Sequence, residues 1–306
     1  MKKNRLGKSD LHVSAMGLGC MSLGTDKEKA KAIIDRALDL GINYLDTADL
    51  YDFGLNEEIV GEAVKAKRQD IIIATKVGNR REKGTEGWSW DPSKAYIKEQ
   101  VKNSLRRLQT DYIDLYQLHG GTIEDNIDET IEAFEELKRE GAIRYYGISS
   151  IRPNVIREYV KKSSIISVMM QYSILDRRPE EEVMSLLENN GISIIARGPL
   201  AKGLLTDQGM EKLEEKFSNK GYLDYSHEEL RTLIPQLQQL RPPHTLNETA
   251  IQYCLYSPAV AAVIPGASSI DQLEENVKSI NSPSLSEEEV YQIQQLSKAN
   301  QYDVHR

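Results

Sequence analysis

The sequence predicts an α/β protein built as a single (β/α)₈ TIM barrel, and three observations lead to this prediction. Short β-branched runs alternate with helical patterns along the chain, and Gly41, Gly141 and Gly191 each stand between a helix and the next strand. Such alternation requires parallel strands joined by helical crossovers. Eight units in 306 residues fit a barrel that typically takes ~250 residues plus extensions. No change of composition marks a linker, so we expect one domain over residues 1–306.

The individual elements follow from local patterns. The expected strands are residues 13–19, 42–46, 71–76, 112–118, 143–149, 167–171, 192–196 and 260–264. We also expect a short N-terminal hairpin and an extra C-terminal helix. Capping-box spacing marks the starts of three helices, at Thr25 with Glu28, at Ser269 with Gln272 and at Ser286 with Glu289.

Composition excludes several classes of protein. A formal net charge of -8 argues against nucleic acid or an anionic membrane as the main partner. No run approaches the ~18–20 apolar residues of a membrane span, and the start has no apolar run typical of a signal peptide. Cys20 and Cys254 are the only cysteines, which suits a reducing compartment and argues against a disulfide framework or a cysteine-based zinc site. We expect a soluble cytoplasmic protein, monomeric or weakly oligomeric, without a metal.

One motif favours a different fold. Residues 17–22 read GLGCMS, which is close to the G-x-G-x-x-G dinucleotide fingerprint, and Asp46 would then be the acid that binds the ribose. Ser22 stands in place of the third glycine, so the match is weak. This Rossmann-type alternative also gives no role to Lys76 or His119.

Polar residues end three consecutive strands of the predicted barrel. Asp46 ends the second strand, Lys76 the third and His119 the fourth, and Tyr51 follows in the loop after Asp46. Each alone has an ordinary explanation as a solvated strand end or a turn residue. In a (β/α)₈ barrel, however, catalytic groups come from the carboxyl ends of different strands. Together the four residues therefore predict an active site at that rim.

At this point the sequence resembles the aldo-keto reductases, and most closely the bacterial branch related to the β-subunits of voltage-gated potassium channels. The resemblance spans nearly the whole chain. The segments that carry it are LDTADLYDFGLNEEIVG (45–61), IIATKVG (72–78), LRRLQTDYIDLYQLH (105–119), LKREGAIRYYGISS (137–150), QYSILDR (171–177), GPLAKGLLT (198–206) and IPGASSIDQLEEN (264–276).

The resemblance implies reduction of a small-molecule carbonyl by a catalytic tetrad at Asp46, Tyr51, Lys76 and His119. A tyrosine hydroxyl, with an ordinary pKa of ~10, is a poor acid unless its phenolate is stabilised. Lys76 would supply that stabilisation, Asp46 would keep the lysine charged, and His119 would donate to the carbonyl oxygen. A nicotinamide cofactor would carry the hydride.

The resemblance also implies a binding site for that cofactor. Ser149 and Gln171 resemble the groups that hold the carboxamide, the loop 197–204 resembles the one that covers the pyrophosphate, and residues 266–276 match the adenosine end. A barrel loop followed by a helix N-terminus is also a general anion site. The expected contacts are Gly19, Cys20, Met21, Asp46, Ser149, Ser150, Gln171, Arg197, Gly198, Pro199, Leu200, Lys202, Gly203, Gly266, Ser268, Gln272, Glu275 and Asn276.

Departures from the family pattern affect the cofactor. Ser150 stands where many members have Asn, so one carboxamide contact is in question. Gly266 and Gln272 replace the Lys and Arg that take the 2′-phosphate in the classical branch. The nearer branch still prefers NADPH, so we expect NADPH over NADH, with Lys202 or Lys220 as phosphate partners.

Arg197 is the third departure, because relatives commonly place an aromatic ring there to stack on the nicotinamide. A guanidinium is planar but permanently charged. Arg197 could lie against the ring and disfavour its oxidised, positive form, or turn to the pyrophosphate and strengthen both redox forms alike.

The substrate is not specified by the sequence. In the loop 78–92, Trp88 and Trp90 could wall the pocket or be pinned against the barrel rim. The tail 300–306 could cover the site or be frayed, and Asp49 and Asp52 are expected to be turn and surface acids. An alternative function remains open, a cofactor-binding redox sensor on the same fold with little turnover.

Overall fold

The computed structural model describes residues 1–81, 87–218 and 220–306. In this part of the chain, eight parallel strands lie side by side in the order β3-β4-β5-β8-β9-β10-β11-β12. Their bounds are β3 (Leu18–Gly19), β4 (Tyr44–Asp46), β5 (Ile72–Val77), β8 (Ile113–Leu118), β9 (Ile143–Ser149), β10 (Ser167–Gln171), β11 (Ser193–Arg197) and β12 (Val260–Ile264).

The first and last strands of this sheet meet through a few backbone contacts. Gly17 donates its N–H to Val263 O at 2.9 Å, and Val263 donates to Ala15 O at 3.0 Å. A parallel bridge joins Gly19 to Gly266 farther along. These contacts close the sheet, so the predicted (β/α)₈ barrel is confirmed.

The predicted first strand, 13–19, is wrong in its extent. Residues His12–Ser14 form β2, which pairs antiparallel with β1 (Lys3–Arg5), and only Leu18–Gly19 join the barrel. The hairpin packs its apolar side chains into the barrel interior, because Leu6, Leu11 and Val13 belong to the same buried cluster as Leu115 and Ile195. The expected short N-terminal hairpin is therefore present, and it includes residues 13–14 that were assigned to the first barrel strand.

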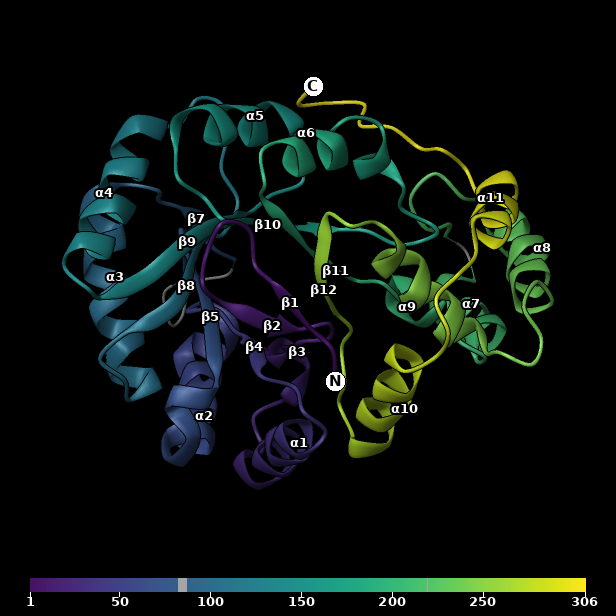
Figure 1. Ribbon diagram of the computed structural model, residues 1–306, viewed down its shortest axis with the longest axis horizontal. Helices are drawn as coiled ribbons and strands as arrows, with labels where there is room; N and C mark the ends of the chain where they lie inside the picture. The colour runs from purple at the N-terminus through teal and green to yellow at the C-terminus, as the bar shows by residue number, and fades with distance from the viewer. Residues whose placement is uncertain (82–86, 219) are drawn as a thin grey trace.

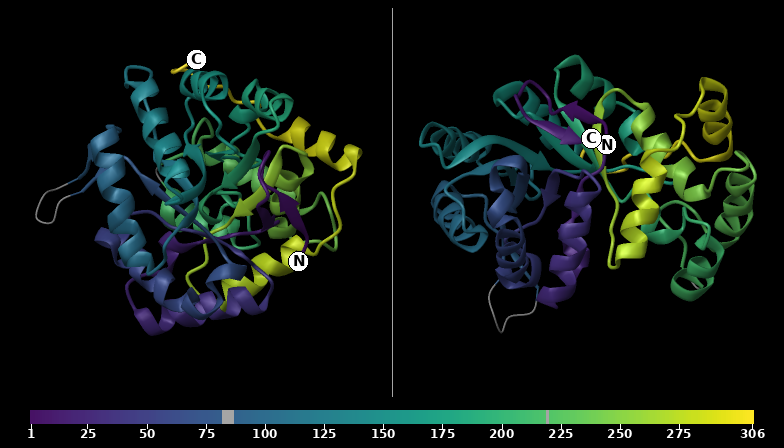
Figure 2. Two further views of the ribbon diagram at one scale, coloured as in Figure 1. Left: turned by 60° about the vertical axis from the view of Figure 1, so that its left-hand side comes forward. Right: turned by 60° about the horizontal axis from the view of Figure 1, so that its bottom comes forward.

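The helices lie outside the strands, as Figure 1 shows. They are α1 (Lys27–Asp39), α2 (Leu55–Val64), α3 (Lys94–Leu108), α4 (Ile127–Arg139), α5 (Pro153–Lys162), α6 (Val183–Asn189), α7 (Gly209–Phe217), α8 (His227–Gln238), α9 (Leu246–Tyr256), α10 (Ile270–Ile280) and α11 (Glu287–Leu296). Helix α11 is the expected extra C-terminal helix, and it contacts α8, beside which it lies in Figure 1. Figure 2 shows the helices around the strands from two further sides. In the part of the chain that the structure describes, no helix is both long and apolar enough to cross a membrane.

Two of the three predicted helix starts are confirmed. Ser269 caps α10 by accepting from the Gln272 backbone, and Ser286 caps α11 in a reciprocal capping box. The prediction at Thr25 is wrong, because the side chain of Asp26 accepts from Lys29 N and α1 begins at the next residue. Aspartate is an equally good N-cap, so spacing alone did not separate the two positions.

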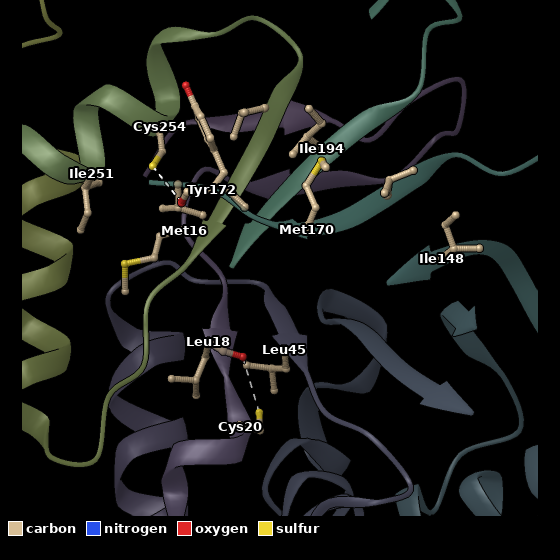
Figure 3. Close-up of a cluster of buried hydrophobic side chains, with 14 of the residues drawn as sticks. Met16, Leu18, Cys20, Leu45, Ile148, Met170, Tyr172, Ile194, Ile251 and Cys254 are labelled. Carbon is tan, nitrogen blue, oxygen red and sulfur yellow. Dashed lines mark hydrogen bonds between the residues drawn. The ribbon is translucent and has the colours of Figure 1, made fainter. Parts of the chain in front are cut away.

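Two apolar clusters position the site. One lies between the strands and the surrounding helices and contains Ile251 and Cys254 of α9 together with Met170 and Ile194 of the strands (Figure 3). The other cluster fills the barrel interior and includes the apolar side chains of the N-terminal hairpin. Asp46, Lys76 and Gln117 are buried polar residues at the carboxyl ends of β4, β5 and β8. Buried polar side chains of the barrel are therefore clustered at its carboxyl rim.

Candidate active site

Asp46, Lys76 and Tyr51 form one hydrogen-bonded chain. Lys76 Nζ donates to Asp46 Oδ1 at 2.5 Å, to Thr47 O at 2.8 Å and to the Tyr51 hydroxyl at 3.3 Å. Asp46 and Lys76 come from the neighbouring strands β4 and β5, and Tyr51 begins the turn Tyr51–Gly54 that leads to α2. The parallel register thus brings residues separated in sequence to one point.

His119 joins this group from the end of β8. Its backbone N–H donates to Val77 O at 2.7 Å, which continues the strand pairing. Its ring meets the Tyr51 ring edge-on, with centroids 6.1 Å apart and planes at 85°. The structure therefore brings all four residues of the expected tetrad together at the carboxyl rim.

Lys76 is placed to stay charged. It is 1% exposed, and burial alone would lower the pKa of its ammonium group. The Asp46 carboxylate and the Tyr51 oxygen outweigh burial and raise that pKa above its ordinary value. A permanent positive charge thus lies against the tyrosine hydroxyl.

His119 is placed to stay neutral. Burial, Lys76 and Arg197 together lower the pKa of its imidazole to about 3. Its Nδ1 is buried and has no hydrogen-bond partner among the described residues. A neutral imidazole carries one N–H donor and one acceptor, so it can donate to a ligand oxygen without transferring a proton.

Asp49 behaves differently from the predicted turn acid, whereas Asp52 is exposed as expected. The Asp49 Oδ1 atom is buried without a partner in the described structure. Burial, followed by the nearby Glu57 carboxylate, raises the pKa of Asp49 to about 8. This carboxyl group is therefore held in a site that disfavours its charge.

A cavity of about 650 Å³ opens beside the tetrad. Asp46 and Tyr51 line it, and Lys76 lies behind them. It continues past the ends of β10, β11 and β12 to the start of α10. Of the expected cofactor contacts from Gly19 to Asn276, all line this cavity except Cys20, Ser149 and Ser150 and the alternative phosphate partner Lys220.

The side chains of these residues lie outside the cavity lining. The Cys20 side chain is fully buried, and its Sγ donates to Leu18 O at 3.6 Å in the apolar core (Figure 3). Ser150 is buried, and its Oγ accepts from the backbone N–H of Arg152 at 3.2 Å. Ser149 ends β9 and is paired in register with Met169, which lines the cavity, but Ser149 is not itself a lining residue. Lys220, the second expected phosphate partner, does not line the cavity either.

Gln171, Arg197 and Tyr222 form a polar group at the tetrad end of the cavity. Arg197 Nη1 donates to Gln171 Oε1 at 3.1 Å, and Gln171 Nε2 donates to the Tyr222 hydroxyl at 3.2 Å. Gln171 and Arg197 are paired in register at the ends of β10 and β11. The side chain of Gln171 is thereby fixed at the mouth of the barrel.

The other end of the cavity is formed by the start of α10. Asn276 Nδ2 donates to Gly266 O at 3.2 Å, and Gln272 Oε1 accepts from both N and Oγ of Ser268 at 2.9 and 3.0 Å. A Cβ atom on Gly266 would lie 2.9 Å from Ser22 Oγ, so a side chain there would crowd the cavity wall. Helix N-termini favour anions, so this end suits a phosphate group.

Several lining residues were not predicted from the sequence. Lys212 and Lys216 face the cavity from α7, and Asn247 faces it from α9. Asn247 Oδ1 is buried without a partner in the described structure, so it is free to accept from a ligand. The four-residue spacing of the two lysines places them on one face of a helix and was the available signal.

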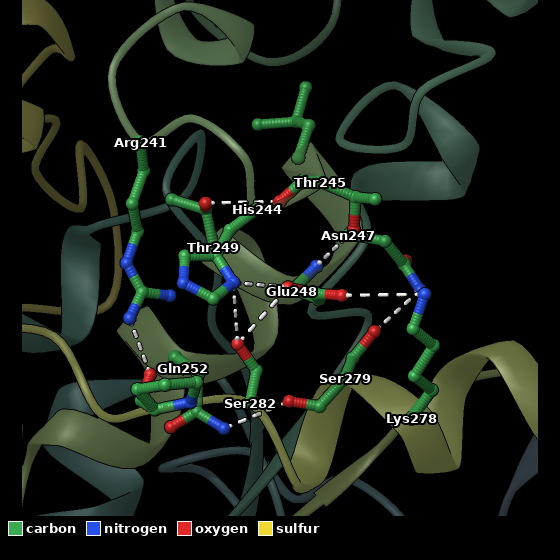
Figure 4. A network of polar contacts seen from close by, with 12 residues as sticks. Arg241, His244, Thr245, Asn247, Glu248, Thr249, Gln252, Lys278, Ser279 and Ser282 are labelled. Carbon is green, nitrogen blue, oxygen red and sulfur yellow. Dashed lines mark hydrogen bonds and ion pairs between the residues drawn. The ribbon is translucent and has the colours of Figure 1, made fainter.

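A polar network behind Asn247 supports this wall (Figure 4). His244 Nδ1 lies 2.8 Å from Glu248 Oε2, and Ser282 Oγ donates to the same carboxylate oxygen at 3.1 Å. The serine hydroxyl lies 3.3 Å from that same Nδ1 atom, so it is not aligned with the second ring nitrogen as a nucleophile would be. The network joins α9 to the end of α10 and has a structural role.

Trp90 is pinned against the rim. Its Nε1 donates to Asp125 Oδ1 at 2.9 Å, and its ring occupies the space where a Cβ on Gly78 or Gly120 would lie. Trp88 is 61% exposed. Part of the loop 78–92 lies outside the described residues, so its expected role at the pocket stays a prediction.

The C-terminal tail is packed rather than frayed. Figure 1 shows it running from α11 to the side of α5 and α6. Asn300 Oδ1 accepts from Arg177 N at 2.8 Å, Tyr302 is 5% exposed, and His305 O accepts from Asn154 N at 2.9 Å. The tail therefore packs against the segments that follow β9 and β10.

Comparisons with known proteins agree with this arrangement. A model of the aldo/keto reductase family matches residues 15–298. The chain is 62% identical to the uncharacterized oxidoreductase YqkF of Bacillus subtilis over 100% of both chains, and 32% identical to an NADH-specific methylglyoxal reductase of Escherichia coli over 92% of this chain and 94% of that one. The holo form of aldo-keto reductase AKR11C1 from Bacillus halodurans is similar in structure, with a TM-score of 0.95, 62% identity and coverage of 100% and 99%. The chain belongs to the aldo/keto reductase family.

Proposed function

We propose that this protein reduces an aldehyde or ketone to an alcohol with a nicotinamide cofactor, and that Tyr51 donates the proton. The observation that carries the proposal is the position of Lys76 Nζ, bonded to both Asp46 Oδ1 and the Tyr51 hydroxyl beside a long polar cavity. Tyr51 alone would be a weak acid. The buried ammonium group makes loss of its proton less costly, because it stabilises the phenolate that remains.

Each residue of the tetrad has one task in this reaction. When bound, the cofactor supplies the hydride that goes to the carbonyl carbon. Tyr51 gives its proton to the carbonyl oxygen, so the product is a neutral alcohol and the phenolate is left beside Lys76. Asp46 keeps Lys76 charged and oriented. His119, neutral because its pKa is lowered to about 3 by burial, Lys76 and Arg197, donates an N–H to the carbonyl oxygen and sets its direction.

The residues that line the cavity fit a dinucleotide. Gln171 would hold the carboxamide of the nicotinamide, and the loop 197–204 would cover the pyrophosphate. The start of α10 and the unpartnered Asn247 Oδ1 would bind the adenosine end. The cavity volume of about 650 Å³ is within the range of cofactor sites.

NADPH is the cofactor that the charges favour. Away from the tetrad, the cavity is lined by three lysines and two acids. The lysines are Lys202, Lys212 and Lys216, and the acids are Asp207 and Glu275. A 2′-phosphate adds about two negative charges, and the surplus of one lysine charge over the two acids can offset part of them. The relative from Escherichia coli is described as NADH-specific, so the choice of cofactor varies among the relatives.

Kinetics with the two cofactors test this choice. We expect a higher kcat/KM with NADPH than with NADH, and a loss confined to NADPH when the lysine that meets the 2′-phosphate is replaced. Lys202→Met, Lys212→Met and Lys216→Met are the variants to compare. A wild-type enzyme that prefers NADH would contradict the proposal.

A panel of aldehydes separates the enzyme from the redox-sensor alternative. We expect loss of NADPH absorbance and stoichiometric formation of alcohol with at least one member of the panel. Tight cofactor binding without turnover on any aldehyde would favour the sensor. Location in the cytoplasm, a monomeric or weakly oligomeric state and a single domain stay predictions from the sequence.

A further inference from the structure

The segment that carries Tyr51 also borders another cavity, of about 290 Å³, which we call the Asp49 cavity. Asp49 lines it just before the turn of Tyr51, Asn79 lines it from β6 (Asn79–Arg80), and Arg107 lines it from α3. Among the described residues, it shares no lining residue with the cavity beside the tetrad. Ligand pockets typically measure ~300–1,000 Å³, so the Asp49 cavity suits a small molecule.

Two acceptor oxygens of the Asp49 cavity have no donor in the described structure. Asn79 is 7% exposed, and its Nδ2 donates to His119 O at 2.9 Å, but its Oδ1 is buried without a partner. Asp49 Oδ1 is buried without a partner as well. An unpaired buried acceptor is costly, so this cavity favours a ligand that brings N–H or O–H donors.

Asp49 also lacks a cationic partner among the described residues. Two cations act on its carboxyl group, Arg107 and Lys76. Arg107 Nε donates to Glu57 Oε2 at 2.6 Å, and Lys76 is bonded to Asp46 at 2.5 Å, so each is already paired with another carboxylate. Burial and then Glu57 raise the pKa of Asp49 to about 8. A positively charged ligand would stabilise this carboxylate.

The exposed side of the Asp49 cavity has the opposite charge. Arg80 and Arg81 line it there, against one exposed acid, Glu99. The Arg81 guanidinium lies over the Phe53 ring at 4.2 Å and has no carboxylate partner in the part of the chain that the structure describes. Arg80 Nη1 lies 4.0 Å from Asp91 Oδ2. A planar guanidinium is well suited to a ligand carboxylate.

We propose that the Asp49 cavity binds a free α-amino acid, whose ammonium group is held by Asp49 and Asn79 and whose carboxylate is held by Arg81. An ammonium group brings three donors and a positive charge, so it meets both unpartnered oxygens and the unpaired acid. A simple amine would leave the exposed guanidiniums unused, and a simple carboxylate would leave the buried acceptors unpaired. The proposal goes beyond the proposed function and does not depend on it.

Binding should release a proton at pH 7. Without a ligand most Asp49 carboxyl groups are protonated at this pH, because their pKa is about 8, and a bound ammonium group lowers that pKa. The tyrosines that also face Asp49 stay neutral, because burial raises the pKa of their hydroxyls. The groups that face Asp49 are Glu57 of α2, Lys76 of β5, Tyr96 and Arg107 of α3 and Tyr116 of β8.

Calorimetric titration of the full chain tests the proposal. The probes are glycine, L-alanine, L-serine and L-glutamine, together with ethylammonium and propionate, which are the amine and acid halves of alanine. We expect at least one of the amino acids to bind in the millimolar range or more tightly, and to bind more tightly than either half. Titrations at pH 7 in two buffers of different ionisation enthalpy count the released proton. No binding by any of the four amino acids would overturn the proposal.

Three variants locate the binding. Asp49→Asn should weaken the amino acid and ethylammonium roughly tenfold or more and remove the proton release, because it removes a hydrogen bond to a charged group. Arg81→Gln should weaken the amino acid and leave ethylammonium unchanged. Asp52→Asn is the matched control, because Asp52 is an exposed acid of the same turn that does not line the Asp49 cavity, and it should bind as the wild type does.

Thermal unfolding shows that each variant is compared as folded protein. Added NADPH should leave the affinity for the amino acid unchanged, because the two cavities share no lining residue among those described. Competitive displacement by NADPH would place the amino acid in the other cavity and overturn the proposal. Binding that Asp49→Asn leaves at the wild-type strength would overturn it as well.

Discussion

Gln117 donates from Nε2 to Asp46 Oδ2 at 3.3 Å, while Lys76 occupies Oδ1 of the same carboxylate at 2.5 Å. Gln117 is fully buried on β8, and its Oε1 has no partner in the described structure. A carboxylate held at both oxygens cannot rotate, so the direction in which it presents charge to Lys76 is fixed. We therefore predict that Gln117 is a positioning residue, which acts on Tyr51 through Asp46 and Lys76.

Gln117→Met tests this role, because methionine fills nearly the same volume without a donor. We expect kcat to fall roughly tenfold, since a hydrogen bond to a charged group contributes about 1.5–3 kcal/mol and Lys76 still holds the other oxygen. KM for the carbonyl should change little. Asp46 Oδ2 loses its donor, which costs stability, while the removal of the unpartnered Gln117 Oε1 acceptor offsets that cost, so the free energy of unfolding should stay near the wild-type value. A parallel loss of stability and activity would indicate a purely structural role.

Lys76→Met should cost both activity and stability. It leaves the Asp46 carboxylate 4% exposed without its cation, and breaking a buried ion pair in this way destabilises by about 3–5 kcal/mol. The double variant with Asp46→Asn should regain much of the stability and none of the activity. Chemical denaturation followed by circular dichroism measures the first, and turnover of an aldehyde the second.

Lys31→Met is a control for Lys76→Met, because the ion pair between Lys31 and Asp35 has the same N–O distance as the one between Lys76 and Asp46. Lys31 Nζ lies 2.5 Å from Asp35 Oδ2, but both side chains are about half exposed. Exposed pairs contribute little, so the free energy of unfolding should hardly change. Equal losses in the Lys31 and Lys76 variants would show that burial is not the deciding factor.

Asp49 should make stability depend on pH. Burial and then Glu57 raise the pKa of this carboxyl from 3.8 to about 8, so between these values the folded protein retains a proton that the unfolded chain releases. The contribution of Asp49 to stability is therefore full below pH 3.8 and declines as the pH rises toward 8. Asn cannot ionise, so Asp49→Asn should be increasingly stabilising over that window, by up to ~1.4 kcal/mol for each pH unit.

Denaturation of the wild type and Asp49→Asn at several pH values checks this expectation. The exposed neighbour supplies a control, because Asp52→Asn should follow the pH dependence of the wild type. A constant difference between Asp49→Asn and wild type across the window would contradict the raised pKa.

Local signals explain why much of the fold could be predicted from the sequence. Gly41, Gly141 and Gly191 have φ values of +86°, +77° and +64°, which follow from the turn that ends each helix and favour glycine over other residues. The ends of β4, β5 and β8 were predicted within one residue, because a buried strand stops where its polar residues begin. The parallel fold then brings those ends together, so the convergence of Asp46, Lys76 and His119 could be predicted from their positions at the strand ends.

Contacts between distant segments explain the rest. Nothing local distinguishes residues 12–14, which join the N-terminal hairpin, from residues 18–19, which join the barrel. Tyr222 reaches Gln171 only because the segment after β11 folds back over the cavity. Cys20 follows a strand end that lines the cavity, yet its side chain turns into the core. These directions depend on packing, which a single sequence does not display.

The role of Tyr51 as the proton donor is the central claim, and Tyr51→Phe tests it most directly. The variant keeps the ring and removes only the hydroxyl that Lys76 bonds at 3.3 Å. The measurement is a single turnover, in which protein loaded with NADPH is mixed with a good aldehyde and oxidation of the bound cofactor is followed. We predict that Tyr51→Phe binds NADPH about as tightly as the wild type and oxidises it ~10²–10⁴-fold more slowly. Oxidation at close to the wild-type rate would show that another group donates the proton.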